Sequence, residues 1–308
     1  MPASGDVAPP RCIIVVRCCT SKVRATGAGG VAYPRSPLPT APTPVSDLFS
    51  ALLLGILEGL TEFLPVSSTG HLLIAQHWLG ARSDFFNIVI QAGAILAVTL
   101  VFRRRLWELA THLGDPANRD YVAKLAVAFL VTALVGLPVR LAGWELPETV
   151  TPIAWALVLG GVWMLVAEHY AEKRGDVATV TWKVAVLVGL AQVVAGIFPG
   201  TSRSAAAIFM AMLAGTSRRA SAAEFVFLVG IPTMFAASAY AFLELAMEGG
   251  LGEEDWAGVA VAFVAAAVTG FAVVRWLMGY IKAHRFTGFA VYRIALGIGL
   301  LAFMPTGA

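Results

Sequence analysis

The sequence predicts an all-α polytopic membrane protein. Hydrophobic residues make up 58% of its 308 residues and charged residues only 13%, whereas a soluble domain of this length needs more charge to cover its surface. The mean hydropathy is +0.77, and the apolar residues form long runs separated by short charged segments. Two runs break at a proline, Pro65 and Pro199, which indicates two helical hairpins.

From residue 47 onward, the apolar runs predict two re-entrant hairpins and about six transmembrane helices. The hairpins cover 47–80 and 183–214. The apolar runs that follow each hairpin are long enough to cross a bilayer. These spans lie near 86–102, 121–141, 150–168, 221–246, 256–274 and 288–304. The chain therefore divides into a first repeat, 47–168, and a second repeat, 183–304.

Charged residues between the spans set the expected orientation, because loops rich in Lys and Arg stay in the cytoplasm. Arg103, Arg104 and Arg105 place one loop inside, whereas Glu145 and Glu148 mark the next loop as outside. This alternation holds only if each hairpin returns to the side from which it entered. The first hairpin then enters from outside and the second from the cytoplasm. This is an inverted-topology repeat, in which broken helices line a polar cavity near the bilayer midplane.

The first 46 residues have a different composition, rich in Pro, Gly, Ala, Ser and Thr. We expect residues 1–46 to be disordered, or to reflect a start codon placed too early, with Val45 as an alternative start. Cys12, Cys18 and Cys19 all lie here and are expected to be incidental thiols. The net charge of +3 is scattered along the chain, which disfavours nucleic acid as a partner.

Two carboxylates lie in the apolar helix of the first hairpin. Glu58 and Glu62 are four residues apart and therefore share one helical face. Like charges this close in a membrane require a cation or a shared proton. We expect a divalent cation, Mg²⁺ or Ca²⁺, that joins both carboxylates to phosphate oxygens. The alternative is a structural pair that shares a proton.

Hydroxyl groups and a histidine follow the proline of the first hairpin. Ser67, Ser68 and Thr69 offer hydrogen bonds to an anion. His71 can act as a nucleophile or as a general acid and base near neutral pH. The concentration of these groups beside two carboxylates predicts an active site rather than a structural polar cluster.

The second hairpin reads as a diverged copy of the first. Aligning Pro65 with Pro199 sets Gln192 opposite Glu58 and Ser202 opposite Ser68. The loop of this copy contains Thr201, Ser202, Arg203 and Ser204. An arginine can hold a phosphate with two parallel N–H groups, and the amides that open the following helix complete an anion site. One site built from two half-sites is therefore expected.

The sequence Glu58-Gly-Leu-Thr-Glu62-Phe-Leu-Pro-Val-Ser-Ser-Thr-Gly-His71, with Pro199-Gly-Thr-Ser-Arg203-Ser, resembles the undecaprenyl-diphosphate phosphatase family, the bacitracin-resistance membrane phosphatases. The segment Phe289-Ala-Val-Tyr-Arg293 is also similar, so the resemblance covers about 47–304. It implies a hydrolase of the bacterial inner membrane, accessible from the periplasmic side. Such an enzyme converts undecaprenyl diphosphate to undecaprenyl phosphate, recycling the lipid carrier for peptidoglycan synthesis and conferring bacitracin resistance.

The resemblance also implies roles for individual residues. The implied catalytic residues are Glu58, Glu62, Ser68, His71 and Arg203, and Glu58 and Glu62 are also the implied metal ligands. The expected substrate contacts are Ser67, Thr69, Gln192, Thr201, Ser202 and Ser204. One departure is that Ala205 and Ala207 replace the glycine and threonine of the family pattern. The sequence leaves open whether the protein forms a homo-oligomer. The alternative functions are a transporter and a binding protein.

Overall fold

The computed structural model describes residues 44–142, 149–247 and 254–304, and the regular structure in these ranges is helical. The expectations for the N-terminal 43 residues, including the disorder and the three cysteines, lie outside the described residues. The first helix starts at Pro44, three residues before the expected start of the membrane domain. The all-α fold class expected from the composition is confirmed.

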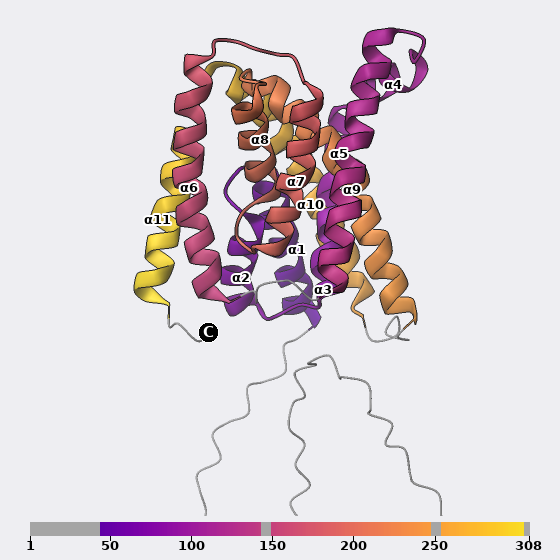
Figure 1. The fold of residues 1–308 in the computed structure, drawn as a ribbon. Helices are drawn as coiled ribbons and strands as arrows, with labels where there is room; N and C mark the ends of the chain where they lie inside the picture. The colour runs from indigo at the N-terminus through magenta and orange to yellow at the C-terminus, as the bar shows by residue number, and fades with distance from the viewer. Residues whose placement is uncertain (1–43, 143–148, 248–253, 305–308) are drawn as a thin grey trace, which may run out of the picture. The chain divides into compact units, whose positions relative to one another are not determined.

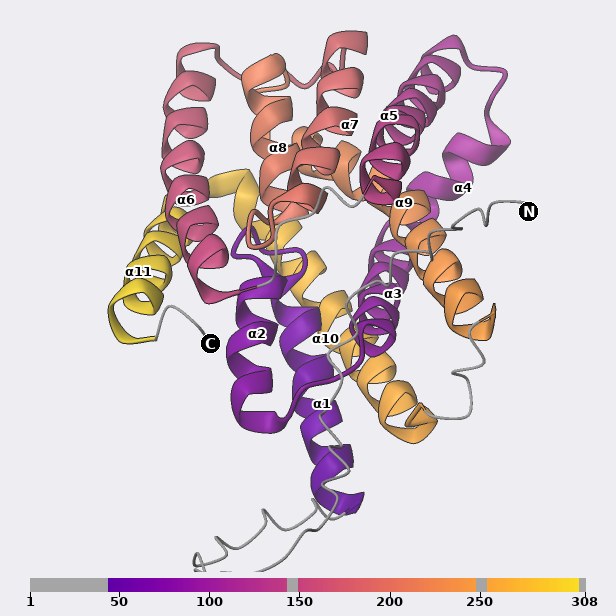
Figure 2. The same cartoon turned by 60° about the horizontal axis from the view of Figure 1, so that its bottom comes forward.

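Two helical hairpins enter the bundle from opposite ends, and their loops meet between them (Figures 1 and 2). The first consists of α1 (Pro44–Thr61) and α2 (Ser68–Leu79). The second consists of α7 (Trp182–Ile197) and α8 (Arg203–Ala214). Both breaks follow the sequence pattern, because a proline in the loop cannot continue the hydrogen-bonded ladder of a helix.

Longer helices surround the hairpins. In the described ranges, five helices are long and apolar enough to cross a membrane. They are α3 (Asp84–Val101), α5 (Pro116–Leu141), α6 (Val150–Lys173), α9 (Arg219–Met247) and α10 (Trp256–Ala283). The sixth predicted span corresponds to α11 (Thr287–Phe303), an apolar helix of 17 residues that is shorter than these five.

A short helix, α4 (Arg103–Thr111), occupies a segment expected to be a loop. The side chain of Arg105 pairs with Glu108 one turn later at 3.0 Å and with Glu224 of α9 at 3.3 Å. Leu109 is buried in the same helix. The run of arginines looked like a loop in the sequence, because the residues that pair with Arg105 lie on the next turn of α4 and on α9.

Close contacts between helices occur at glycines in related places in the two halves. Gly55 of α1 lies against the carbonyl oxygen of Ala262 on α10, and Gly189 of α7 lies in the same way against Ala128 on α5. A Cβ at Gly189 would be only 2.6 Å from that oxygen. Inside a membrane the hydrophobic effect does not drive helices together, because lipid tails are as apolar as the side chains. Small residues instead let helix backbones approach closely and gain van der Waals contacts. These contacts fix where each hairpin stands.

At the end of the bundle opposite the first hairpin, where α6 ends (Figure 1), ion pairs join the helices and their connecting segments. The buried carboxylate of Glu168 on α6 accepts hydrogen bonds from Arg219 of α9, at 2.5 to 3.0 Å, and from the amide of Phe286 at 2.9 Å. Next to it, Arg218 donates to the exposed Asp176, and these hydrogen bonds lower the pKa of Asp176. Glu168 therefore connects three helices through one carboxylate.

We predict that Arg219→Ala destabilises the protein by on the order of 2 to 3 kcal/mol, because it leaves Glu168 buried without its guanidinium. The neighbouring Arg218→Ala removes an exposed pair that solvent already screens, and it should destabilise the protein much less than Arg219→Ala does. Thermal unfolding of both variants in the same detergent measures the difference. Equal losses in the two variants would contradict the assigned role of Glu168.

Candidate active site

The carboxylate of Glu62 joins the two hairpins. Its Oε1 accepts a hydrogen bond from Arg203 Nη2 at 3.1 Å, and its Oε2 accepts one from Ser68 Oγ at 2.5 Å. The backbone oxygen of Glu62 accepts a further hydrogen bond from Ser204 Oγ at 3.2 Å. The half-sites expected from the sequence are therefore brought together, with Glu62 and Ser68 from one hairpin and Arg203 and Ser204 from the other.

The helices that follow the two loops begin in the same way. Ser67 caps α2 and Ser202 caps α8, and each hydroxyl accepts the amide three residues later. Both serines have a positive φ, 74° and 67° respectively, a conformation that costs a non-glycine residue roughly 1–2 kcal/mol. Ser202 therefore corresponds to Ser67 in the structure. The alignment through the prolines, which set Ser202 opposite Ser68, is off by one residue in the loops.

Arg203 presents unused donors to a cavity. Its Nη2 donates to Glu62 and, at 2.6 Å, to Gln91 Oε1 of α3, whereas its Nε and Nη1 donate to no described residue. About 35% of the side chain is exposed. A guanidinium held on one edge by two acceptors can offer its other edge to an anion. Gln91 was not among the predicted site residues, and the signal for it was an amide side chain in a mostly apolar span.

The cavity beside Arg203 is small and polar, with a volume of about 180 Å³. Five predicted site residues line it: Glu62, Ser68, Thr69, Ser202 and Arg203. Gly196, Pro199 and Gly200 of the second hairpin also line it, together with Gln91. A hydroxyl, a carboxylate and a guanidinium thus face one space large enough for a small anionic group.

Glu58 does not line this cavity. Its side chain is fully buried, and neither carboxylate oxygen has a hydrogen-bond donor among the described residues. A buried carboxylate in this state requires a proton or a cation. Glu62 stands one turn away, but no group of three or more His, Cys, Asp or Glu side chains suited to a metal occurs in the described ranges. The two glutamates thus fit a cation only if water or a ligand supplies further oxygen atoms.

His71 contacts α11. Its Nδ1 lies 2.7 Å from the carbonyl oxygen of Ser67, and its Nε2 lies 2.7 Å from the hydroxyl of Tyr292. The two rings are stacked, with centroids 5.7 Å apart. His71 is not among the residues that line the polar cavity. Tyr292 was not predicted as a site residue, because its partner His71 lies 221 residues away in the chain.

The remaining predicted contacts lie around the cavity without lining it. Ser67 is buried as the cap of α2, and Ser204 bonds the backbone of the first hairpin. Gln192 accepts a hydrogen bond from Thr233 at 3.3 Å. Thr201 lines a separate apolar groove. Ala207, one of the two departures from the family pattern, is buried in the hydrophobic core.

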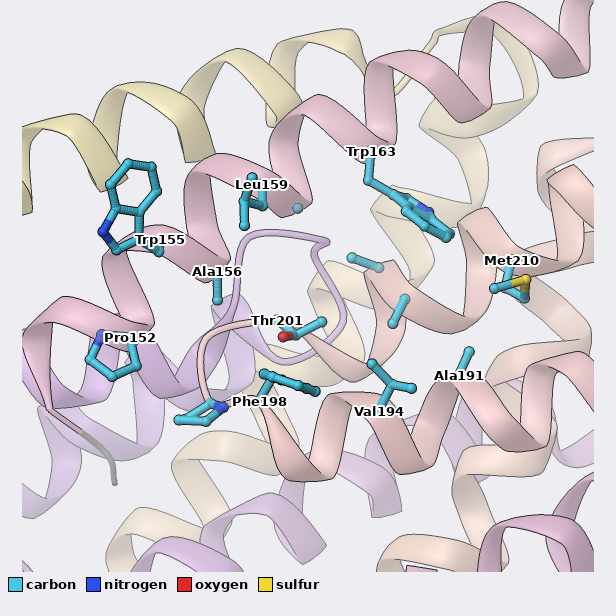
Figure 3. Close-up of a pocket in the computed structure, with 14 residues that line it drawn as sticks. Pro152, Trp155, Ala156, Leu159, Trp163, Ala191, Val194, Phe198, Thr201 and Met210 are labelled. Carbon is cyan, nitrogen blue, oxygen red and sulfur yellow. The ribbon is translucent and has the colours of Figure 1, made fainter. Parts of the chain in front are cut away.

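Two apolar grooves flank α7. One, of about 570 Å³, lies between α6, α7 and α8, and Figure 3 shows Trp155, Trp163 and Phe198 along it. The other, of about 460 Å³, lies between α5, α7 and α9. Arg203 lines this second groove as well as the polar cavity. The second groove therefore leads directly from apolar surface to the charged group of the site.

Fold and site together define a helical membrane protein with a polar cavity formed where two helical hairpins meet. The comparison with known families agrees: the model described as "Bacitracin resistance protein BacA" matches residues 51–299. The chain belongs to this family.

Curated relatives are similar over almost their whole length. An undecaprenyl-diphosphatase of Stenotrophomonas maltophilia (strain K279a) is 75% identical over 264 residues, which cover 86% of this chain and 100% of the relative. The undecaprenyl-diphosphatase of Xanthomonas axonopodis pv. citri (strain 306) is 72% identical with the same coverage. That of Xanthomonas campestris pv. campestris (strain 8004) is 72% identical over 85% of this chain and 99% of its own length.

Proposed function

We propose that this protein is a membrane phosphatase that hydrolyses undecaprenyl diphosphate to undecaprenyl phosphate and inorganic phosphate. The relatives named undecaprenyl-diphosphatase support the substrate. The observation that carries the reaction type is the hydrogen bond between Ser68 and Glu62 in the cavity that Arg203 lines. A hydroxyl bonded to a carboxylate, facing an arginine, is an arrangement suited to phosphoryl transfer. In the cell, this reaction recycles the carrier lipid for peptidoglycan synthesis.

The geometry supports a two-step reaction. Arg203 binds the terminal phosphate with its free N–H groups, and Ser68 Oγ attacks the phosphorus while Glu62 takes its proton. The bond from phosphorus to the bridging oxygen breaks, and the proton passes to the departing lipid monophosphate. Water then attacks the phosphoserine, and its proton returns through Glu62 to Ser68 Oγ. Arg203 stabilises the negative charge in both steps.

Glu58 and Glu62 are the residues that would hold a divalent cation, Mg²⁺ or Ca²⁺. The donorless oxygens of Glu58 support this assignment, and diphosphate oxygens would complete the ligand set. A bound cation would neutralise charge on the diphosphate. His71 is placed to act on the first loop through Ser67, and its proposed part in the reaction is to hold or move a proton there.

The apolar tail of the substrate is proposed to lie in the groove between α5, α7 and α9. This groove shares Arg203 and Gly196 with the polar cavity, so a head group bound at Arg203 leaves the tail next to it. The groove between α6, α7 and α8 shares Pro199 with the cavity but does not include Arg203. The head group and the tail would thus be bound on two sides of one guanidinium.

The proposed topology is an inverted repeat in the inner membrane, with the site open to the periplasm. The opposite entry of the two hairpins supports it (Figure 2). Reciprocal glycine contacts do so as well: Gly161 of α6 lies against the oxygen of Ala290 on α11, and Gly297 of α11 lies against that of Ala154 on α6. The basic loop at α4 and the Arg218–Arg219 pair belong on the cytoplasmic side.

The first prediction from this function is that purified protein in detergent releases phosphate from a long-chain polyprenyl diphosphate, and more rapidly with Mg²⁺ or Ca²⁺. Arg203→Ala and Glu62→Gln should each lower the rate at least about tenfold, since each removes a transition-state contact. Ser68→Ala should have a comparable or larger effect. Gly299→Ala, at a site with open space around the glycine, is the control.

Full activity in Arg203→Ala and Glu62→Gln would remove this site assignment. Activity retained by Ser68→Ala alone would indicate direct attack by water with Glu62 as base. His71→Gln in the same assay shows whether the contact with the first loop affects turnover. If well-folded protein released no phosphate, the transporter alternative would be favoured, since opposed hairpins are also found in transporters.

The groove assignment predicts a dependence on chain length. Ala133→Trp fills the groove that contains Arg203 and should raise KM for the long-chain substrate by about tenfold, because the tail loses buried area. It should leave a short-chain prenyl diphosphate almost unaffected. Ala206→Trp in the other groove is the matched control. If Ala206→Trp alone gave the chain-length effect, the tail would lie between α6, α7 and α8.

The topology is tested by labelling single cysteines in a background in which the native cysteines are replaced by serine. Cysteines at Ala81 and Ala142 should react with a membrane-impermeant reagent on intact cells, because both positions are exposed on the proposed periplasmic side. Cysteines at Asp115 and Lys173, exposed on the opposite side, should react only after the membrane is opened. Labelling of all four from one side would exclude the inverted repeat.

A further inference from the structure

A second arginine lies between the two hairpin loops. Arg293 of α11 is fully buried and is the largest of the fully buried side chains. Its Nη1 donates to the carbonyl oxygen of Pro65 at 3.2 Å. Its Nη2 donates to the carbonyl oxygens of Gly200 and Thr201, at 3.1 and 3.0 Å. One guanidinium therefore contacts the backbone of both loops.

The groups that accept hydrogen bonds from Arg293 are carbonyl oxygens rather than carboxylates. A fourth contact, to Ala156 of α6, is also to a carbonyl, at 3.1 Å, and no ion pair within the described ranges includes Arg293. A buried charge without a counter-ion is costly. A guanidinium buried where the two loops meet must therefore be offset by what its hydrogen bonds do for these loops.

The contact with Thr201 determines the direction of the next amide. The carbonyl of Thr201 and the N–H of Ser202 belong to one planar trans peptide and point in opposite directions. With the carbonyl directed at Arg293, the Ser202 amide is directed away from it, and Ser202 lines the polar cavity. This amide donates to no acceptor among the described residues. It is thus available to a ligand, and Arg293 holds it beside the strained φ of Ser202.

The helix that faces Arg293 leaves room for it. Gly160 of α6 lies against the guanidinium, and a Cβ at this position would be 2.8 Å from Arg293 Cζ. A methyl group at Gly160 would therefore displace the guanidinium without altering any residue of the loops. This makes Gly160 a way to test Arg293 without changing its charge.

We propose that Arg293 is a positioning residue for the reaction: it fixes the two loops so that the Ser202 amide and Arg203 together bind the phosphoryl group being transferred. This inference rests on the proposed phosphatase function. Arg293 itself does not touch the substrate. Its effect is transmitted through the peptide between Thr201 and Ser202, where a correctly directed N–H stabilises the developing negative charge.

The test compares Gly160→Ala and Arg293→Lys with the wild type and with the control Gly299→Ala. Turnover of the polyprenyl diphosphate is measured alongside the affinity for vanadate, which resembles the five-coordinate phosphoryl group, by titration calorimetry. We expect both variants to lower kcat by about tenfold or more and to weaken vanadate binding by a similar factor. KM should change by less than about threefold, because the lipid tail and Arg203 still bind the ground state.

Unchanged kcat and vanadate affinity in both variants would overturn the proposal. So would a loss of turnover that merely follows the folded fraction, with normal vanadate binding, since this is the result of a structural role alone. Calorimetry does not require turnover. If the wild type released no phosphate, the proposed function would fail, while the vanadate affinities would still decide whether Arg293 shapes the anion site.

Discussion

Backbone that is not helical must find hydrogen-bond partners inside the protein when it lies at membrane depth, because lipid offers none. Both hairpins of this protein break in the interior of the bundle, and the solution is the same type of contact at each break. Ser67 and Ser202 cap the following helices, Ser204 donates to carbonyls of the opposite loop, and Arg293 donates to carbonyls of both. The side chains that close the breaks also position those that face the cavity.

Two charged side chains inside the bundle also depend on partners from the opposite hairpin. Glu62 and Arg203 neutralise each other across the hairpins at 3.1 Å, so the pair can be buried together more readily than either group alone. Glu58 has no such partner. One carboxylate more than the site can neutralise by itself is consistent with a site that receives a cation together with its anionic substrate.

Much of this arrangement could be predicted from the sequence. The composition and the two proline breaks were sufficient for the fold class and the hairpins, and the polar motifs identified Glu62, Ser68, Ser202 and Arg203, which the structure brings together. The pattern did not reveal α4, because arginines that pair with Glu108 and Glu224 look like a solvated loop. Local periodicity reports which face is apolar, but not which distant residue an exposed charge will meet.

The direction in which the polar side chains point could not be predicted from the sequence either. His71 stands three residues after Ser68, yet Ser68 faces the cavity and His71 bonds Tyr292 of α11. Gln91 and Arg293 were visible as polar residues in apolar spans, but their roles depend on distant contacts. Gln91 accepts a hydrogen bond from Arg203, 112 residues away, and Arg293 donates to Pro65, 228 residues away. Such contacts follow from how the helices pack, not from spacing along the chain.

The size of the polar cavity has a consequence for how the reaction would end. A space of about 180 Å³ holds a phosphate head group but not a polyprenyl chain, and the groove that continues from Arg203 is apolar. The two products would therefore separate into different phases. Inorganic phosphate would leave for water, and the lipid monophosphate would leave through this groove into the bilayer. Recombination of the two would then be opposed by the boundary between membrane and solvent.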